Sequence, residues 1–155
     1  MSDIKSSVSI VIPHWNNVDV LSECLESISN TDFENFETIV VDNASTDNSV
    51  ASVRSNYPNV KLIENDKNYG YAGGCNIGAE AASGDFLIFL NNDTVQEKDW
   101  ISNLIKTINS DDKIAAVQPK ILNYYDRNVF DYAGGSGGHM DIYCFPFARG
   151  RIFSF

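Results

Sequence analysis

Short apolar runs recur along the chain and alternate with longer segments that have helical periodicity. The runs lie at residues 8–12, 38–41, 60–63, 86–90 and 114–117. Runs this short, with few polar residues, predict strands that are buried on both faces. Because strands and helices alternate, the sequence predicts an α/β fold with a mostly parallel sheet and helices on both faces.

Helices are predicted between these strands at residues 18–29, 47–56, 79–82 and 97–109. The first has apolar residues at the spacing of one helix face, and the last should turn its larger apolar side chains inward: Trp100, Leu104, Ile105 and Ile108. Ser45, Thr46 or Asp47 is suited to capping the second helix. After Pro119 the sequence is aromatic and glycine-rich without helical periodicity, which predicts antiparallel strands and loops. We therefore expect one domain over residues 1–120 and the start of a second region over 121–155, continued beyond Phe155 in the natural protein.

The charge balance restricts the partners of the chain. It carries 11 basic and 21 acidic residues, a formal net charge of −10, and has no basic stripe. A nucleic-acid partner is therefore not expected, nor is docking of this segment onto an anionic membrane. An anionic ligand would have to be held by backbone N–H groups or by a bound cation.

The cysteines and the N-terminus bear on the cellular compartment. Cys24, Cys75 and Cys144 are scattered, which fits neither a disulfide framework nor a zinc site and is typical of buried thiols in a reducing cytosol. The N-terminus has no apolar signal core, and no apolar run approaches the ~20 residues of a membrane span. We expect a cytoplasmic protein.

Polar side chains follow four of the predicted strands directly. They lie at residues 13–17, 42–45, 65–68 and 91–93. In open α/β sheets the ligand lies beyond the carboxyl ends of the strands, so these residues predict one binding edge. The alternative is that Asn and Asp simply form turns there.

The glycine-rich segment at residues 70–78 matches neither the dinucleotide fingerprint nor a P-loop. Its glycines, which open a helix, either leave backbone N–H groups free for a phosphate or allow close packing on the sheet.

Asp93, after a fully apolar strand, is a hard oxygen ligand suited to Mg²⁺ or Mn²⁺, or else an ordinary turn residue. Asp42 is placed to bind a ribose hydroxyl or a base N–H. His14 either approaches a ligand or is an ordinary polar residue at the surface, and His139 is a weaker candidate metal ligand.

Four segments, residues 9–16, 38–47, 68–76 and 84–93, together resemble family 2 inverting glycosyltransferases of the GT-A fold. The resemblance covers roughly residues 7–120, and residues 41–45 and 70–74 are similar to bacterial rhamnosyltransferases. It implies transfer of a sugar from a dTDP- or UDP-linked donor to a hydroxyl of a glycan or lipid-linked acceptor, with inversion. The setting it implies is bacterial cell-surface polysaccharide synthesis, with a longer protein lying at the inner face of the membrane.

The resemblance also implies roles for particular residues. Asp93 would bind the divalent cation, Mg²⁺ or Mn²⁺, and Asp42 the base or ribose. Gly70 stands where many relatives have a basic residue, and Asn92 replaces the first acid of the usual pair. The full set of implied donor-binding residues is Pro13, Trp15, Asn16, Asp42, Asn43, Asn68, Gly70, Asn76 and Asn92.

The general base of the family is an acid in the half that follows the metal strand. None of the acids beyond Asp93 lies in a recognisable version of that motif, so we expect the base to be absent and the chain alone to bind donor but transfer little. Its aromatic tail should pack against a second copy in a homodimer or take no fixed fold. Two other classes stay open. One is a non-catalytic nucleotide-sugar-binding or interaction module. The other is a sugar-nucleotide or nucleotidyl transferase, which would need a basic, glycine-rich loop at residues 14–18.

Overall fold

The computed structural model describes residues 6–129, 138–140 and 146–148. The chain divides into two compact units, Met1–Ser102 and Asn103–Phe155. The sequence-based boundary after residue 120 stays a prediction. No helix among the described residues is long and apolar enough to cross a membrane.

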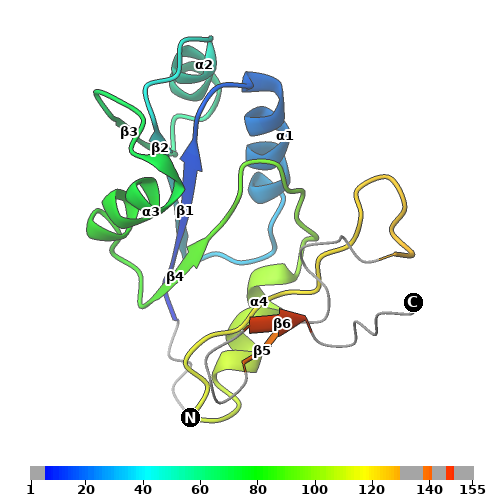
Figure 1. Cartoon of the computed structure of the whole chain (residues 1–155). Coiled ribbons are helices and arrows are strands. Elements are labelled where there is room, and N and C mark those ends of the chain that lie inside the picture. The colour runs from blue at the N-terminus through cyan, green and yellow to red at the C-terminus, as the bar shows by residue number, and fades with distance from the viewer. Residues whose placement is uncertain (1–5, 130–137, 141–145, 149–155) are drawn as a thin grey trace. The chain divides into compact units, whose positions relative to one another are not determined.

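A four-stranded parallel sheet forms the centre of the first unit (Figure 1). Its strands are β1 (Val8–His14), β2 (Phe36–Asp42), β3 (Lys61–Glu64) and β4 (Phe86–Phe89), in the order β3-β2-β1-β4. Each neighbouring pair is parallel, and His14 lies opposite Asp42. The predicted α/β fold and its first four strands are therefore confirmed.

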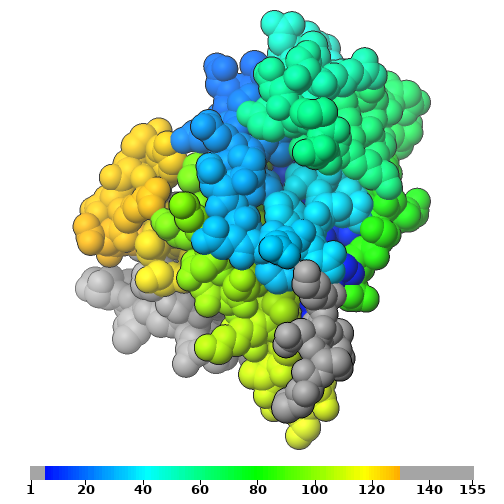
Figure 2. Space-filling model, turned by 180° about the vertical axis from the view of Figure 1, so that it is seen from behind, coloured from blue at the N-terminus to red at the C-terminus, as the bar shows by residue number. Residues whose placement is uncertain are grey.

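Helices cover both faces of this sheet. They are α1 (Val18–Ser29), α2 (Ser49–Asn56) and α3 (Gly70–Glu80), and α4 (Trp100–Ile108) follows β4. Figure 1 shows α3 on one side of the sheet and α1 on the other, and Figure 2 shows α1 in blue on the side seen from behind. The inward face of α1 is the predicted one, with Leu21, Cys24, Leu25 and Ile28 buried. In α4 the predicted Trp100 is buried, and so is Ile101, which the sequence pattern did not single out.

The glycine-rich segment is itself the body of α3, whereas the sequence predicted a helix only at residues 79–82. A Cβ on Gly78 would lie 2.2 Å from Val11 Cγ1, and one on Gly74 would lie 2.9 Å from Pro13 Cβ. Glycine therefore lets α3 approach the sheet closely, and this packing outweighs its poor intrinsic helix propensity. Of the two interpretations, close packing explains Gly74 and Gly78. Gly70 begins the helix at φ +72° with open space where a Cβ would stand.

The strand predicted at residues 114–117 does not form, and that prediction was wrong. Ala115 and Ala116 are exposed and have no strand partner. A four-residue apolar run becomes a strand only where a sheet edge is available to it, and sequence pattern does not reveal that.

The second unit does contain the predicted antiparallel pairing, between β5 (Gly138–Met140) and β6 (Pro146–Ala148). The predicted behaviour of the aromatic tail falls mainly on residues 130–137, 141–145 and 149–155, outside the described residues.

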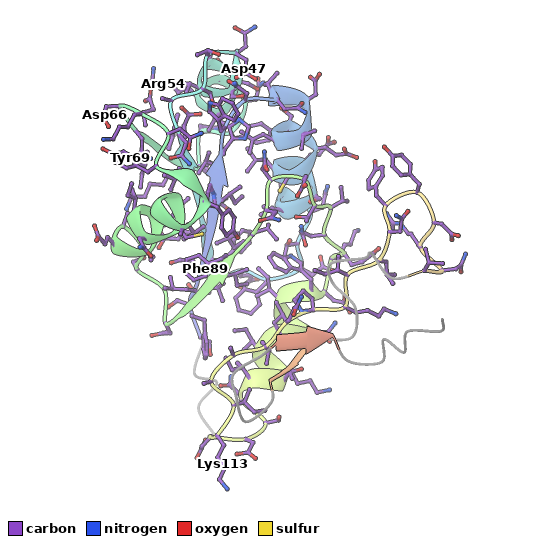
Figure 3. All side chains as sticks on the ribbon, in the orientation of Figure 1. Asp47, Arg54, Asp66, Tyr69, Phe89 and Lys113 are labelled. Atoms are coloured by element: carbon purple, nitrogen blue, oxygen red, sulfur yellow. The ribbon has the colours of Figure 1, made fainter. Side chains whose placement is uncertain are left out.

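The outer strand β4 has one apolar face that is only half covered. Leu87 and Phe89 are 44% and 48% exposed, although the sequence predicted a strand buried on both faces. Register places Phe89 opposite Val11, on the side where α3 packs (Figure 3). Because α3 packs over β1 and β2, it leaves this part of β4 open.

The amino ends of the strands are tied together through Glu37. Its Oε1 accepts hydrogen bonds from Ser9 Oγ at 2.6 Å and from the backbone N and Oγ of Ser83, both at 2.7 Å. Ser9 Oγ in turn accepts from Gly84 N at 2.8 Å. The bonds from Ser9 and then Ser83 lower the pKa of Glu37, because they favour the charged carboxylate.

We expect Glu37→Gln to reduce the free energy of unfolding by about 1 kcal/mol at neutral pH, because three charge-assisted hydrogen bonds become neutral ones. The pKa of Glu37 is depressed in the folded state, so its contribution is complete above the ordinary glutamate value and is lost as the pH falls through the folded value. Urea unfolding at a series of acidic pH values should therefore show a weaker pH dependence in Glu37→Gln than in the wild type. Glu34→Gln, which alters an exposed acid nearby, is the matched control. Parallel pH profiles for wild type and Glu37→Gln would contradict this assignment.

Candidate nucleotide-sugar site

The polar loops after the four strands meet at the carboxyl ends of the strands, which we call the carboxyl edge of the sheet. Figure 3 shows Asp47, Arg54, Asp66 and Tyr69 at this end of the first unit. Hydrogen bonds join the loops to one another: Thr46 N donates to Asn16 Oδ1 at 2.8 Å, and Asn65 Nδ2 donates to Asn43 Oδ1 at 2.9 Å. The sheet thus brings together residues that are far apart in sequence.

Asp42, at the end of β2, combines deep burial with an unused acceptor. Its side chain is 2% exposed, and Oδ2 accepts from Ser45 N at 2.9 Å. Its Oδ1 is buried and has no hydrogen-bond partner among the described residues. An unpaired buried oxygen costs about 1–3 kcal/mol, so this atom is suited to accept an N–H or O–H from a ligand.

The loop after β1 presents an aromatic side chain beside a tight turn. Asn16 and Asn17 both have positive φ, at 58° and 70°. Hydrogen bonds hold Asn16 in place: its backbone N donates to Ser45 Oγ at 2.8 Å, and its Oδ1 accepts from Thr46 N. Pro13 is buried, whereas the indole of Trp15 is 58% exposed and open to a ligand.

Asn43 and Asn68 hold the start of α3. Asn43 is 3% exposed; its Oδ1 also accepts from Tyr69 N at 3.4 Å, and its Nδ2 donates to Gly70 O at 3.3 Å. Asn68 Oδ1 accepts from Gly70 N at 2.8 Å. Asn76 is exposed on the same helix. The polar atoms of Asn43 therefore already have protein partners, and these bonds hold the first turn of α3.

Asp93 lies in the loop after β4 and is exposed. Burial raises the pKa of the Tyr71 hydroxyl, and the neighbouring Cys75 and the charge of Asp93 add to this effect. Burial also raises the pKa of Cys24 to about 11, with the same carboxylate contributing. Cys24 and Cys75 are buried free thiols, as the sequence indicated, and Cys144 is outside the described residues.

His14 is not an ordinary surface residue, because its side chain is buried and only 2% exposed. Its Nε2 lies 2.8 Å from Ser49 Oγ, and its Nδ1 lies 2.9 Å from Asn92 Nδ2. Burial lowers the pKa of His14, and the charges of Asp42 and Asp47 oppose that shift only in part. The contacts with Ser49 and Asn92 had no signal in the sequence, since 35 and 78 residues separate them from His14.

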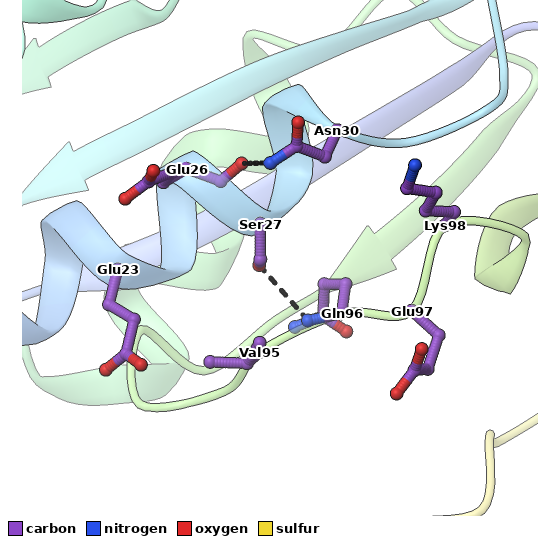
Figure 4. Close-up of a pocket in the computed structure, with 8 residues that line it drawn as sticks. All are labelled: Glu23, Glu26, Ser27, Asn30, Val95, Gln96, Glu97 and Lys98. Atoms are coloured by element: carbon purple, nitrogen blue, oxygen red, sulfur yellow. Dashed lines mark hydrogen bonds between the residues drawn. The ribbon is translucent and has the colours of Figure 1, made fainter.

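A groove of about 490 Å³ lies elsewhere in the first unit, between α1 and the loop before α4 (Figure 4). Its floor is fixed by Gln96 N, which donates to Ser27 Oγ at 3.1 Å. Three glutamates and one lysine are among the side chains that line it: Glu23, Glu26, Ser27, Asn30, Val95, Gln96, Glu97 and Lys98. None of these residues stands at the carboxyl end of a strand, where ligands of open α/β sheets lie, so the carboxyl edge is the better candidate for the nucleotide.

The described residues contain no group of three or more His, Cys, Asp or Glu side chains arranged to hold a metal ion. A cation at Asp93 would therefore take most of its ligands from its own waters and from substrate phosphates, as Mg²⁺ commonly does. The side chain of His139 and the acids Asp131 and Asp141 lie outside the described part of the chain.

Comparison with known proteins defines the class of this chain. The pattern of Glycosyl transferase family 2 matches residues 9–143, so the chain belongs to that family. A Methanococcus voltae protein named as a dolichyl N-acetyl-α-D-glucosaminyl phosphate 3-β-D-2,3-diacetamido-2,3-dideoxy-β-D-glucuronosyltransferase is 31% identical over 74% of this chain and 36% of its own length. The poly(ribitol-phosphate) β-glucosyltransferase of Bacillus spizizenii is 38% identical over 56% of this chain and 14% of its own length.

Solved structures support the same fold. A Pyrobaculum calidifontis mannosyltransferase, in complex with GDP-Man and Mn²⁺, matches with a TM-score of 0.64 and 24% identity over 77% of this chain and 34% of its own. S. aureus TarS 1–349, in complex with UDP-GlcNAc, matches with a TM-score of 0.61 and 23% identity over 76% of this chain and 38% of its own. This chain thus spans less than half the length of these relatives. The predicted GT-A fold and the assignment to family 2 are confirmed.

Proposed function

We propose that this chain is the donor-binding part of an inverting glycosyltransferase, which takes a sugar from a nucleoside diphosphate sugar. The observation that carries the proposal is the buried, unpaired Oδ1 of Asp42 at the carboxyl edge of the sheet. A nucleoside provides the donor this oxygen lacks, either a base N–H or a ribose hydroxyl. Trp15, exposed in the neighbouring loop, would cover the base, and Asn16 would line the same pocket through its turn.

The rest of the donor would extend along the same edge. We propose that the start of α3, with Asn68, Gly70 and Asn76, lies along the nucleotide and that Asn92 contacts the ribose. Asn43 would act by fixing α3, since its side chain already bonds Asn65 and Gly70. Pro13 would form the buried wall of the pocket.

A divalent cation, Mg²⁺ or Mn²⁺, fits the chemistry of this edge. Asp93 offers an exposed carboxylate in the loop after β4. The chain has a formal net charge of −10, so a diphosphate needs an added positive charge to bind here. The ion would stabilise negative charge on the departing nucleoside diphosphate.

In the complete reaction, an acceptor hydroxyl attacks the anomeric carbon while the bond to the diphosphate oxygen breaks, which inverts that carbon. A general base must take the hydroxyl proton. We propose that this base is not among the acids of the chain, since none lies in the family motif for it. The acceptor would be a glycan or a lipid-linked sugar. The enzyme would act in bacterial cell-surface polysaccharide synthesis, at the cytoplasmic side of the membrane. The similarity of residues 41–45 and 70–74 to rhamnosyltransferases supports a deoxyhexose donor linked to dTDP or UDP.

The decisive experiment is calorimetric titration with UDP, dTDP and GDP, each in Mn²⁺ and in EDTA. We expect at least one nucleotide to bind about 10-fold or more tightly in Mn²⁺, because the ion offsets repulsion between the diphosphate and the acidic edge. Asp93→Asn should remove most of this difference. Asp99→Asn, which changes an exposed acid in the segment that leads into α4, is the control and should keep it. Equal affinity in Mn²⁺ and in EDTA would refute the metal role.

A non-catalytic nucleotide-sugar-binding module is the second candidate, since the same donor site would serve it. Binding alone does not separate the two. Assay of the natural gene product for sugar transfer to a glycan acceptor does, because only the enzyme would turn over donor.

A further inference from the structure

A buried hydrogen-bond bridge crosses the carboxyl edge of the sheet. It runs from Ser49 in α2, through His14 at the end of β1, to Asn92 in the loop after β4. Ser49 and His14 are 1% and 2% exposed, and Asn92 is half-buried. Two polar side chains buried this deeply must satisfy each other, so the geometry of the bridge is closely fixed.

The placement of the Asn92 amide sets the protonation state of the imidazole. With Asn92 Nδ2 facing the ring, as in this structure, His14 Nδ1 accepts and the ring hydrogen lies on Nε2. That hydrogen is donated to Ser49 Oγ, 2.8 Å away. A doubly protonated ring would set an N–H against the amide N–H of Asn92. The lowered pKa of His14 agrees with a neutral ring.

The ring and the amide hold each other in one arrangement, because a flip of the amide alone would place its oxygen against the lone pair of Nδ1, which is repulsive. With Nδ2 held by the ring, the planar amide turns Oδ1 away from His14. The bridge therefore fixes where an acceptor atom points at the donor edge, and it anchors the residue that directly precedes Asp93.

We propose that His14 is a positioning residue of the donor site, which acts through Asn92 by orienting its amide and steadying the loop that carries Asp93. This inference rests on the proposed function. It assigns His14 no contact with the nucleotide, because the ring is buried and both of its nitrogens are used.

Two substitutions of His14 separate the halves of the bridge. In His14→Asn the amide reaches the place of Nδ1, so Asn92 keeps an acceptor while Ser49 loses its partner. In His14→Gln the longer amide reaches the place of Nε2, so Ser49 keeps its partner and Asn92 loses it. Both variants lose one buried hydrogen bond and should be destabilised to a similar degree.

The affinity for a nucleoside diphosphate in Mn²⁺ should differ between His14→Asn and His14→Gln. We expect His14→Gln to weaken UDP or dTDP binding by about 10-fold, and His14→Asn to stay within about 3-fold of the wild type. Ser49→Ala, which removes only the other bond, should also bind normally. Equal losses in His14→Asn and His14→Gln, or normal binding by His14→Gln, would overturn the proposal.

A double-mutant cycle tests whether His14 acts through Asn92. Asn92→Ala combined with His14→Gln should bind no more weakly than Asn92→Ala alone, and independent, additive losses would overturn the proposal. If the Gln variant does not fold, ¹⁵N NMR of the wild-type imidazole decides instead: a hydrogen on Nε2 supports the bridge and one on Nδ1 overturns it. A wild type that binds no nucleotide in Mn²⁺ refutes the proposed function itself, whereas the outcomes above refute only the role of His14.

Discussion

Gly78→Ala is expected to lower the free energy of unfolding by about 2 kcal/mol or more. The added Cβ would lie 2.2 Å from Val11 Cγ1 and 3.1 Å from Val41 Cγ2. Both valines are fully buried in central strands, so neither can move aside without disturbing the sheet. The overpacking penalty should exceed the roughly 1 kcal/mol that alanine gains over glycine in a helix. Chemical denaturation of wild type and variant measures the difference.

Two further variants test whether the cause is steric. Val11→Ala removes the methyl group that the new Cβ meets, so the double variant should be more stable than the sum of the two single losses by about 1 kcal/mol. Glu80→Ala, an exposed change on the same helix, should leave stability nearly unchanged. Strict additivity between Gly78→Ala and Val11→Ala would show that α3 does not rest on β1 as described.

Asp42→Asn is expected to weaken nucleoside diphosphate binding by about 10–100-fold without lowering the stability of the ligand-free protein. The variant can still accept the bond from Ser45 N, but it places an amide NH₂ where the buried Oδ1 stands. A donor group there cannot accept the N–H or O–H of the ligand, and the loss of one charged hydrogen bond corresponds to about 1.5–3 kcal/mol. In the free protein the same change exchanges one buried polar atom without a partner for another and keeps the bond from Ser45 N, so stability should stay close to that of the wild type. Calorimetry and thermal unfolding measure the two effects.

Asp47→Asn is the matched control for this prediction. Asp47 is an exposed acid in the same turn, where its oxygens accept from Ser49 N at 3.0 Å and from Val18 N at 3.1 Å. Its replacement should lower stability slightly and leave nucleotide affinity unchanged. If Asp47→Asn and Asp42→Asn weaken binding equally, the effect is one of general charge, and the specific role of Oδ1 fails.

The candidate site shows where sequence-based interpretation reached its limit. Asp42 and Asp93 were placed at strand ends by the apolar runs before them, and the resemblance then implied their roles. The burial of Asp42 Oδ1 and the bridge through His14 had no counterpart in the sequence, because both depend on side chains from loops far apart in the chain. Asn43 and Asn68 were expected along the nucleotide, and the structure shows that much of their hydrogen bonding goes to the start of α3.

The sequence by itself determined the strand–helix alternation, the inward face of α1 and the carboxyl edge as the polar edge, because local hydrophobic pattern and chain direction settle all three. Only the tertiary structure decided that residues 70–78 form a helix, that residues 114–117 form no strand and that one face of β4 stays open. Each of these depends on a partner surface. The glycines of α3 allow it to pack closely against Val11, and a strand needs a free neighbour in the sheet. Residues Leu87 and Phe89 of β4 would need a covering element on the part of the α3 side that α3 leaves open. Local sequence encodes which secondary structures a segment can form, whereas the energy that selects one of them comes from the elements that pack against it.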